Sequence, residues 1–287
     1  MDEIKIKTMD IELPTWDLSE IYENIDDPNI ELDIKKIKEL SEDFSIQWKG
    51  KIKNLNASEF LNCIETYQSI SEKIYKIGTH SNLIFATNME DPEISRYNAS
   101  VSDKLTEISS LLVFFTLELS KLDDKTVSEW TKGTNSSKWL PYLTILRKKN
   151  DYLLDPLVEE MLIEKSATGR SAWVRLFDET SAALRFPFKK EMLSEAEILN
   201  LLSDPNPENR KLAGKSLSEV LENNKRILGM ILNVISRDRY IEDNKRGFKG
   251  IVSSRNLDND VEDEVVNTLV TTVNNAMPKL THRYYKW

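Results

Sequence analysis

Apolar residues recur every three or four positions in two long segments of the first half of the chain. The first segment follows Ser58, which we expect to cap a helix, and the second follows Asp91-Pro92 and extends over about seven turns. Two such helices joined by a short loop predict an antiparallel hairpin. The apolar positions are Phe60, Ile64, Tyr67, Ile70, Ile74 and Ile77, then Tyr97, Val101, Leu105, Ile108, Leu112, Phe115, Leu119 and Leu122.

The segment before this hairpin contains a proline that a regular helix would not accept. Pro14 lies in the stretch LPTWDL, and Asp17 or Ser19 could cap the next helix. We therefore expect an ordered arm followed by a short helix. Beyond the hairpin, residues 133–138 (GTNSSK) predict a loop, and the chain restarts at Trp139, so a subdomain boundary is expected near there.

Helix starts and breaks punctuate the second half. Asp155-Pro156 predicts the start of a helix that ends near Gly169, and residues 173–180 belong to the next helix. Residues 184–188 (LRFPF) alternate in polarity and form the one strand candidate, which Pro187 restricts to a sheet edge. Further along, Ser194 and Glu197 have capping-box spacing, and residues 203–207 break the chain. A helix is expected from there to about Glu242, followed by a glycine-bearing turn at 246–250. The last helix follows 258–260, is interrupted at Pro278 and runs towards Trp287 without a stop signal.

These patterns predict a mainly α fold. The expected architecture is a multi-helix assembly with long antiparallel helical hairpins and at most a short edge β element near residues 184–188. The composition agrees, because 8 glycines in 287 residues is well below the usage of about 7% that is typical of proteins, and a turn-rich all-β design needs more.

Charge and hydropathy narrow the classes of partner. Lys plus Arg number 39 and Asp plus Glu 48, a net charge of −9 that would repel a phosphate backbone, so neither nucleic acid nor an anionic membrane is an expected partner. The longest apolar run, 111–115, is far shorter than the roughly 20 residues of a membrane span. The first ten residues resemble neither a secretory signal nor a transit peptide, which predicts a soluble, cytoplasmic protein.

Residues that could carry chemistry are few. A hydrolytic zinc site of the His-Glu-x-x-His kind needs two histidines one turn apart, but His80 and His282 are followed four positions later by Ile84 and Lys286. We predict that both histidines are partly buried helix residues rather than ligands. Cys63 is the single cysteine, so no internal disulfide is possible, and we predict that it is a small buried hydrophobe.

Other chemical motifs are weak. No serine lies in a G-x-S-x-G elbow, and the glycines form neither a P-loop nor a G-x-G-x-x-G pattern. We interpret the acids Asp258, Asp260, Glu262, Asp263 and Glu264 as solvated charge at a helix start rather than a cation site. The aromatic group Tyr284, Tyr285 and Trp287 could line a peptide groove, although core packing is the commoner role of such residues.

The stretch LPTWDLSEIY at residues 13–22, and several ordered stretches after it, resemble those of the oligoendopeptidase F family, which belongs to the thimet-oligopeptidase-like zinc metallopeptidases. Residues 13–22 (LPTWDLSEIY) resemble its opening, LPxWDLSDLY. Residues 164–173 (EKSATGRSAW) and 175–180 (RLFDET) are similar to a run that is typical of bacterial members. The resemblance continues through Leu202-Ser203-Asp204-Pro205, Ser253-Ser254-Arg255-Asn256-Leu257, Val261-Glu262-Asp263-Glu264-Val265-Val266 and His282-Arg283-Tyr284-Tyr285, and so covers nearly the whole chain.

The resemblance implies a helical N-terminal region that packs over a catalytic domain and encloses a channel for short peptides. It also implies zinc, held by the two histidines of HExxH and a later glutamate, with the motif glutamate activating water. These positions lie beyond Trp287, so no catalytic or metal residue is carried over and this chain is not expected to bind zinc. The implied partners are short oligopeptides and the missing catalytic C-terminal half, and a substrate contact among Arg255, His282 and Tyr284 is a hypothesis.

The predicted function is therefore that of the N-terminal portion of a zinc metalloendopeptidase, inactive by itself. The alternative is a non-catalytic helical scaffold that binds peptides or a partner chain. The expected division is an extension at 1–12, a helical hairpin region at 13–133, a family-type helical region at 134–202, and at 203–287 the beginning of the catalytic domain, truncated before HExxH. Truncation would leave apolar faces exposed.

Overall fold

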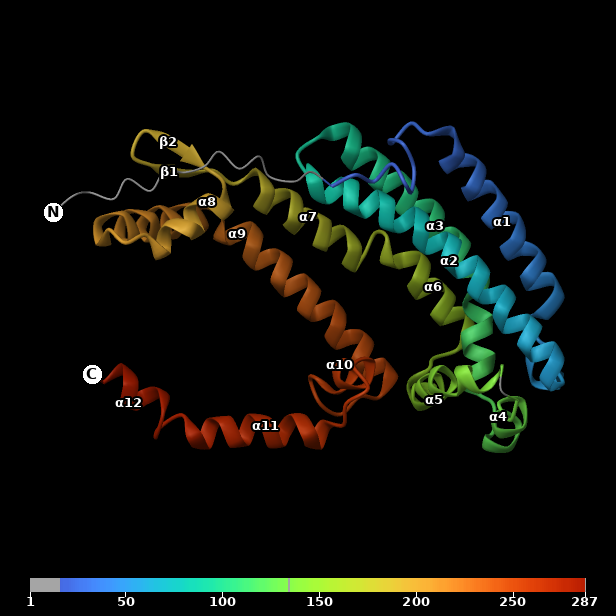
Figure 1. Cartoon of the computed structure of the whole chain (residues 1–287). Helices are drawn as coiled ribbons and strands as arrows, with labels where there is room; N and C mark the ends of the chain where they lie inside the picture. The colour runs from blue at the N-terminus through green and yellow to red at the C-terminus, as the bar shows by residue number, and fades with distance from the viewer. Residues whose placement is uncertain (1–15, 134, 287) are drawn as a thin grey trace, which may run out of the picture.

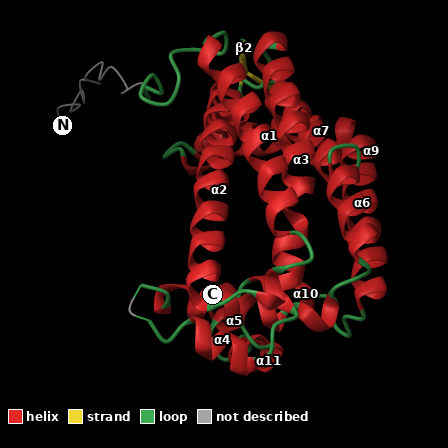
Figure 2. Ribbon diagram, turned by 90° about the vertical axis from the view of Figure 1, so that its right-hand side faces the viewer, coloured by secondary structure: helices red, strands yellow, loops and turns green. Residues whose placement is uncertain are grey.

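The computed structural model describes residues 16–133 and 135–286. Helices make up most of this part (Figure 2), which confirms the mainly α prediction, and they follow the outline of an open C (Figure 1). No helix in the described ranges is both long enough and apolar enough to cross a membrane. The elements are α1 (Pro28–Trp48), α2 (Ala57–Thr87), α3 (Pro92–Ser120), α4 (Asp124–Trp130), α5 (Leu140–Lys148), α6 (Pro156–Ser166), α7 (Arg170–Ala183), β1 (Phe186–Phe188), β2 (Glu191–Leu193), α8 (Glu195–Asn200), α9 (Pro207–Arg246), α10 (Ser253–Asp258), α11 (Asp263–Ala276) and α12 (Thr281–Tyr285).

The two longest segments of the first half, α2 and α3, form the predicted antiparallel hairpin. Asp91 caps α3 and Pro92 occupies its first turn, as expected. The cap of α2 is Asn56, not Ser58: the Asn56 side chain accepts from the amides of Ser58 and Glu59, and the Glu59 carboxylate accepts from the Asn56 amide at 2.9 Å. The predicted cap was wrong because this reciprocal capping box begins two residues earlier.

The segment before the hairpin differs from the prediction. Residues 16–27 form turns instead of a short helix, and the Ser19 amide donates to Asp17 Oδ1 at 2.9 Å. The helix that follows, α1, was not predicted; Asp27 caps it and Pro28 begins it. Its buried residues have helical spacing and pack against α2 and α3: Ile30, Ile34, Ile37, Ser41, Phe44 and Trp48. Residues 1–15, which include the predicted extension and the start of the arm, lie outside the described ranges.

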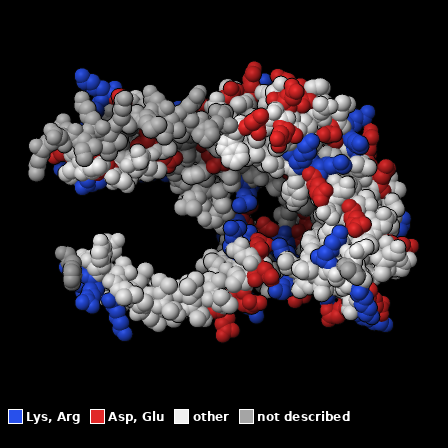
Figure 3. All heavy atoms as spheres, viewed as in Figure 1, with Lys and Arg blue, Asp and Glu red and all other residues white. Residues whose placement is uncertain are grey.

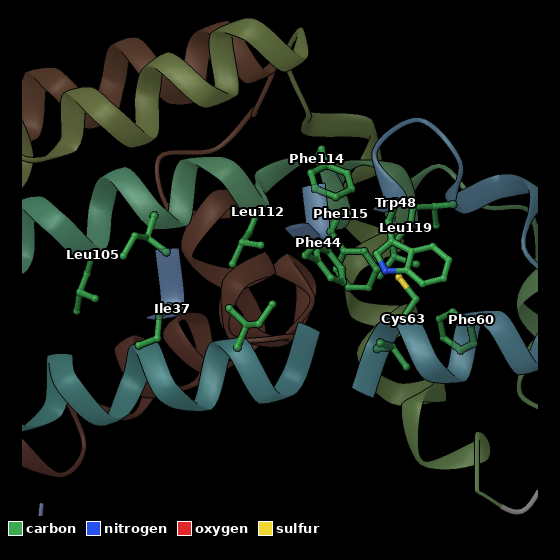
Figure 4. Close-up of a cluster of buried hydrophobic side chains, with 14 of the residues drawn as sticks. Ile37, Phe44, Trp48, Phe60, Cys63, Leu105, Leu112, Phe114, Phe115 and Leu119 are labelled. Carbon is green, nitrogen blue, oxygen red and sulfur yellow. The ribbon is translucent and has the colours of Figure 1, made fainter. Parts of the chain in front are cut away.

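Aliphatic and aromatic side chains together fill the main core, to which each of the helices α1, α2, α3, α4 and α5 contributes (Figure 4). The Phe44 ring meets Phe115 edge-on, with centroids 5.4 Å apart. Phe60 stacks on Trp130 at 4.5 Å, and Trp130 Nε1 donates to the Leu55 carbonyl at 3.2 Å. These contacts hold the short α4 against the foot of α2, which explains how a seven-residue helix is kept in place.

A β-hairpin follows α7. The predicted edge strand is confirmed as β1, but its antiparallel partner β2 was not predicted. Lys189, at the turn between them, has a left-handed backbone with φ of 56°. Phe186 and Phe188 lie in a second, smaller core with Ile198 and Ala213, so the hairpin anchors α8 and the start of α9.

The long helix α9 runs from beside α8 and the β-hairpin to α10, and α11 and α12 form the lower limb of the C (Figure 1). Asn206 caps α9, and Gly247 ends it with a left-handed φ of +85° after 40 residues, a length of about 60 Å. The predicted break at 203–207 and turn at 246–250 are therefore confirmed. From α10 the chain returns as α11 below the opening, and the predicted interruption at Pro278 separates α11 from α12 (Figure 1).

Candidate functional site

Cys63 and His80, whose side chains could in principle take part in catalysis, are both buried in α2. Cys63 is wholly buried, and this burial raises the pKa of its thiol to about 12, so little thiolate exists near neutral pH. The prediction of a buried hydrophobe is confirmed. His80 is completely rather than partly buried; its Nδ1 lies 2.9 Å from the hydroxyl of Tyr97, and the Tyr22 ring packs edge-on against it. Burial lowers the pKa of His80, which favours the neutral ring.

The residues proposed as substrate contacts do not converge. Arg255 lies in α10, whereas His282 and Tyr284 lie in α12, at the opposite end of the 14-residue α11, which is about 21 Å long. His282 is exposed instead of partly buried, and Tyr284 and Tyr285 are exposed rather than packed in a core. Trp287 lies outside the described ranges.

The acidic segment around residue 260 makes ion pairs with a distant helix. Asp258 accepts from Lys149 at 2.9 Å and Asp260 from Lys148 at 2.6 Å. Both acids are exposed, as the interpretation as solvated charge implies. The pairs themselves were not predicted, because the lysines are more than 100 positions away in the sequence. Asp263 instead accepts from the side chains of Ser253 and Asn256 close to it. Across residues 16–133 and 135–286, no group of three or more His, Cys, Asp or Glu side chains is placed to hold a metal ion.

A nearly buried ion pair joins α6 to the end of α9, and sequence reasoning missed it. Arg246 donates to both carboxylate oxygens of Glu159, at 2.5 and 2.9 Å, and the Leu154 amide donates to the same carboxylate at 2.8 Å. Burial by itself would raise the pKa of the Glu159 carboxyl, but these hydrogen bonds outweigh it and lower that pKa. Beside the pair, the Tyr152 ring stacks on the Phe248 ring with centroids 4.0 Å apart. The joint between α6 and the end of α9 is therefore both polar and aromatic.

The inside of the C is a wide hollow that opens to one side (Figure 3). The α11 helix, along its lower limb, has no buried residue, and Leu269 is 64% exposed. Other exposed apolar side chains follow α11 and its continuation at helical spacing: Val265, Val270, Val273, Met277 and Leu280. The expected exposed apolar face is therefore present here. A helix with this pattern ordinarily packs against another element.

The sequence is similar to that of oligopeptidase F proteins. The sequence pattern described as "Oligopeptidase F" matches residues 118–186. The chain is 22% identical over 273 residues to an "Oligoendopeptidase F homolog" of Borreliella burgdorferi, covering 94% of this chain and 45% of the relative. It is 21% identical to the "Oligopeptidase PepF" of Bacillus subtilis, covering 94% of this chain and 41% of that protein. The chain thus spans slightly less than half the length of these curated relatives.

Solved structures share the fold. The crystal structure of oligoendopeptidase-F from Enterococcus faecium superposes on 90% of this chain and 52% of its own, with a TM-score of 0.78 and 21% identity. A putative peptidase from Chlamydophila abortus superposes on 94% of this chain with a TM-score of 0.57 and 15% identity. The chain is therefore related to the N-terminal region of oligopeptidase F proteins.

Proposed function

We propose that this chain is the N-terminal portion of a cytoplasmic, zinc-dependent metalloendopeptidase that hydrolyses internal bonds of short oligopeptides. In this proposal the helices that surround the hollow of the C form part of the wall of the peptide channel. The similarity to oligopeptidase F proteins over nearly the whole chain supports the proposal.

The residues of this chain do not fit a zinc site of the kind that the family resemblance implies. His80 is enclosed between Tyr22 and Tyr97, and His282 lies exposed on α12 with Lys286, not histidine, one turn later. A zinc site needs several converging donors with fixed geometry. The proposal therefore places zinc binding and water activation in the part of the relatives that this chain does not span, and it assigns no catalytic step to residues described above.

The observation that carries the proposal is the uncovered apolar face of α11. Leu269 and Leu280 are 64% and 68% exposed, and burying the remaining exposed surface of each would contribute roughly 1 to 2 kcal/mol. The relatives have about as much chain again beyond the matched region. We propose that the corresponding zinc-bearing half of the full-length protein covers the apolar face of α11, which would close the hollow into a channel.

The division of the chain follows from this role. We propose that the helical hairpin region, 13–133, and the family-type region, 134–202, form the outer wall, and that 203–287 begins the catalytic domain. The predicted extension at 1–12 has no assigned part in the channel.

The test compares the 287-residue chain with a chain extended to the length of the relatives. Zinc content is measured by elemental analysis, and cleavage is followed with a quenched fluorescent oligopeptide. The proposal predicts stoichiometric zinc and chelator-sensitive cleavage for the extended chain and neither for the 287 residues. A third sample, extended but with the motif glutamate replaced by glutamine, should keep the metal and lose cleavage, because the water then lacks its base.

If the extended chain neither binds zinc nor cleaves, the enzyme proposal is wrong and the non-catalytic scaffold becomes the better explanation. Cleavage by the 287 residues alone would also contradict it, because a metal site would then have to exist among the residues of this chain.

A further inference from the structure

A polar groove runs between the α2–α3 hairpin and α7. Two adjoining cavities, of about 310 and 210 Å³, share Asn82, Asn98 and Ser102 as lining residues. The larger cavity has α2 and α3 on one side and the turn before α7, with α7 itself, on the other. Its volume is at the lower end of the range for small-ligand pockets, which is roughly 300 to 1,000 Å³.

The groove exists because two consecutive helices pack against different neighbours. The α6 helix packs closely on α3, whereas α7, which follows the turn at Gly169, packs on α9. The α2–α3 wall presents small side chains such as Ala99 and Ser102, which do not reach α7 and leave the space open.

Charges on the two walls are not paired with each other. Arg170 and Asp178 of α7 and Asp103 of α3 all line the larger cavity. Among the described residues, no ion pair within 4 Å neutralises any of these three, although the exposed helices around them carry many such pairs. Arg175, the remaining cation of the lining, pairs along its own helix with Glu179 at 3.7 Å. Burial without a partner raises the pKa of Asp178.

The separation of the opposite charges on α7 indicates the length of a ligand. Arg170 and Asp178 are eight positions apart on one helix, which places them about 12 Å apart along its axis. An extended peptide of three or four residues has a similar length, at about 3.3 to 3.6 Å per residue. The polarity of α7 agrees, because Arg170 lies at the positive end of the helix, where Gly169 provides no capping side chain.

We propose that this groove binds a short zwitterionic peptide of three or four residues in extended form, with its terminal carboxylate on Arg170 and its terminal ammonium group on Asp178. Asn98 Nδ2 already donates to Ser81 Oγ and to Asn82 Oδ1, each at 3.1 Å. The Asn82 amide group, Asn98 Oδ1 and the Ser102 hydroxyl are the polar groups that would contact the peptide backbone. Binding needs only residues of this chain and no cleavage. Its failure is therefore distinguishable from failure of the proposed peptidase role, which is tested by zinc and hydrolysis in the extended chain.

The experiment titrates trialanine into the 287-residue chain by isothermal calorimetry. We expect saturable 1:1 binding with a dissociation constant on the order of 1 mM. Arg170→Gln and Asp178→Asn should each weaken it about tenfold, because each removes one charge-assisted contact. Arg226→Gln, an exposed arginine of α9 outside the groove, is the matched control and should leave the affinity unchanged. Far-UV circular dichroism checks that every variant is folded.

Chemically capped probes assign each end of the peptide. N-acetyl-trialanine should bind to the native chain about tenfold more weakly than trialanine does. Its affinity for the native chain and for the Asp178→Asn variant should be the same. Trialanine amide should likewise fail to distinguish the native chain from Arg170→Gln. A larger loss in Asp103→Asn than in Asp178→Asn would overturn the assignment of the ammonium end. The site itself is refuted if trialanine does not saturate by about 20 mM, or if capped and free peptides bind alike.

Discussion

The ion pair between Glu159 and Arg246 is expected to hold α6 against the end of α9. Both side chains are largely shielded, at 10% and 16% exposure, and the carboxylate receives three hydrogen bonds, two of them from the guanidinium group. Replacing Arg246 by Met leaves the Glu159 charge in place without its cation. Breaking a buried pair in this way typically costs about 3 to 5 kcal/mol. We expect about 3 kcal/mol, since the pair borders a cavity of about 240 Å³ that gives it some access to water.

The double variant gives the decisive comparison. Glu159→Met should cost about 2 kcal/mol, because Arg246 keeps its contact with Glu242 at 2.8 Å. The double variant, Glu159→Met with Arg246→Met, should lose little more than Arg246→Met alone, because no unpaired charge remains in the joint. The coupling energy is then about 2 kcal/mol. Urea unfolding followed by circular dichroism measures the free energies, and hydrogen exchange at the end of α9 localises the change.

An exposed ion pair provides the control. Lys148 and Asp260 are 43% and 45% exposed, so Lys148→Gln should cost less than about 1 kcal/mol, and raising the salt concentration should remove even that. The Glu159–Arg246 coupling should persist at high salt. Additive single substitutions, or a coupling that salt abolishes, would refute the idea that burial makes this pair strong.

The remaining predictions use other described residues. The depressed pKa of Glu159 means that its contribution is present above the ordinary carboxyl pKa of 4.5 and is lost as pH falls through the lower folded value, so Arg246→Met should flatten the stability profile below about pH 4.5. The depressed pKa of His80 likewise favours folding above its ordinary pKa of 6.5, and stability should fall with pH below that value; a profile that His80→Phe leaves unaltered would contradict this. The Cys63 thiol should resist a disulfide reagent in the native protein and react after unfolding in urea, and rapid native labelling would show that it is accessible. Leu269→Glu should reduce self-association of the chain at high concentration, measured by sedimentation, while changing the unfolding free energy by no more than about 0.5 kcal/mol, unlike a core substitution such as Leu143→Glu.

Several errors in prediction have signals that were present in the sequence. The spacing of Ile30, Ile34 and Ile37 is as regular as that of the helices that were predicted, and Asp27-Pro28 is a start of the same kind as Asp91-Pro92. The Asn56 capping box could also have been recognised from Glu59 three residues later. The partner strand β2 is different, because three residues carry too little periodicity to predict it.

The sequence by itself determined where most of the described helices begin and where α9 ends. Asp155, Ser194 and Gly247 act on backbone groups within a few positions of themselves, so their effects can be predicted from neighbouring residues alone. The family resemblance also rested on ordered motifs and needed no coordinates.

Only the tertiary structure decided which faces and charges meet. Glu159 and Arg246 are 87 positions apart, and nothing local distinguishes them from charges that remain in water. The same holds for the hollow bounded by α9 and α11 and for the groove beside α7, whose walls come from separate parts of the chain. Such sites depend on how several helices pack at once, and a periodic pattern specifies that a face is apolar or charged without specifying its partner.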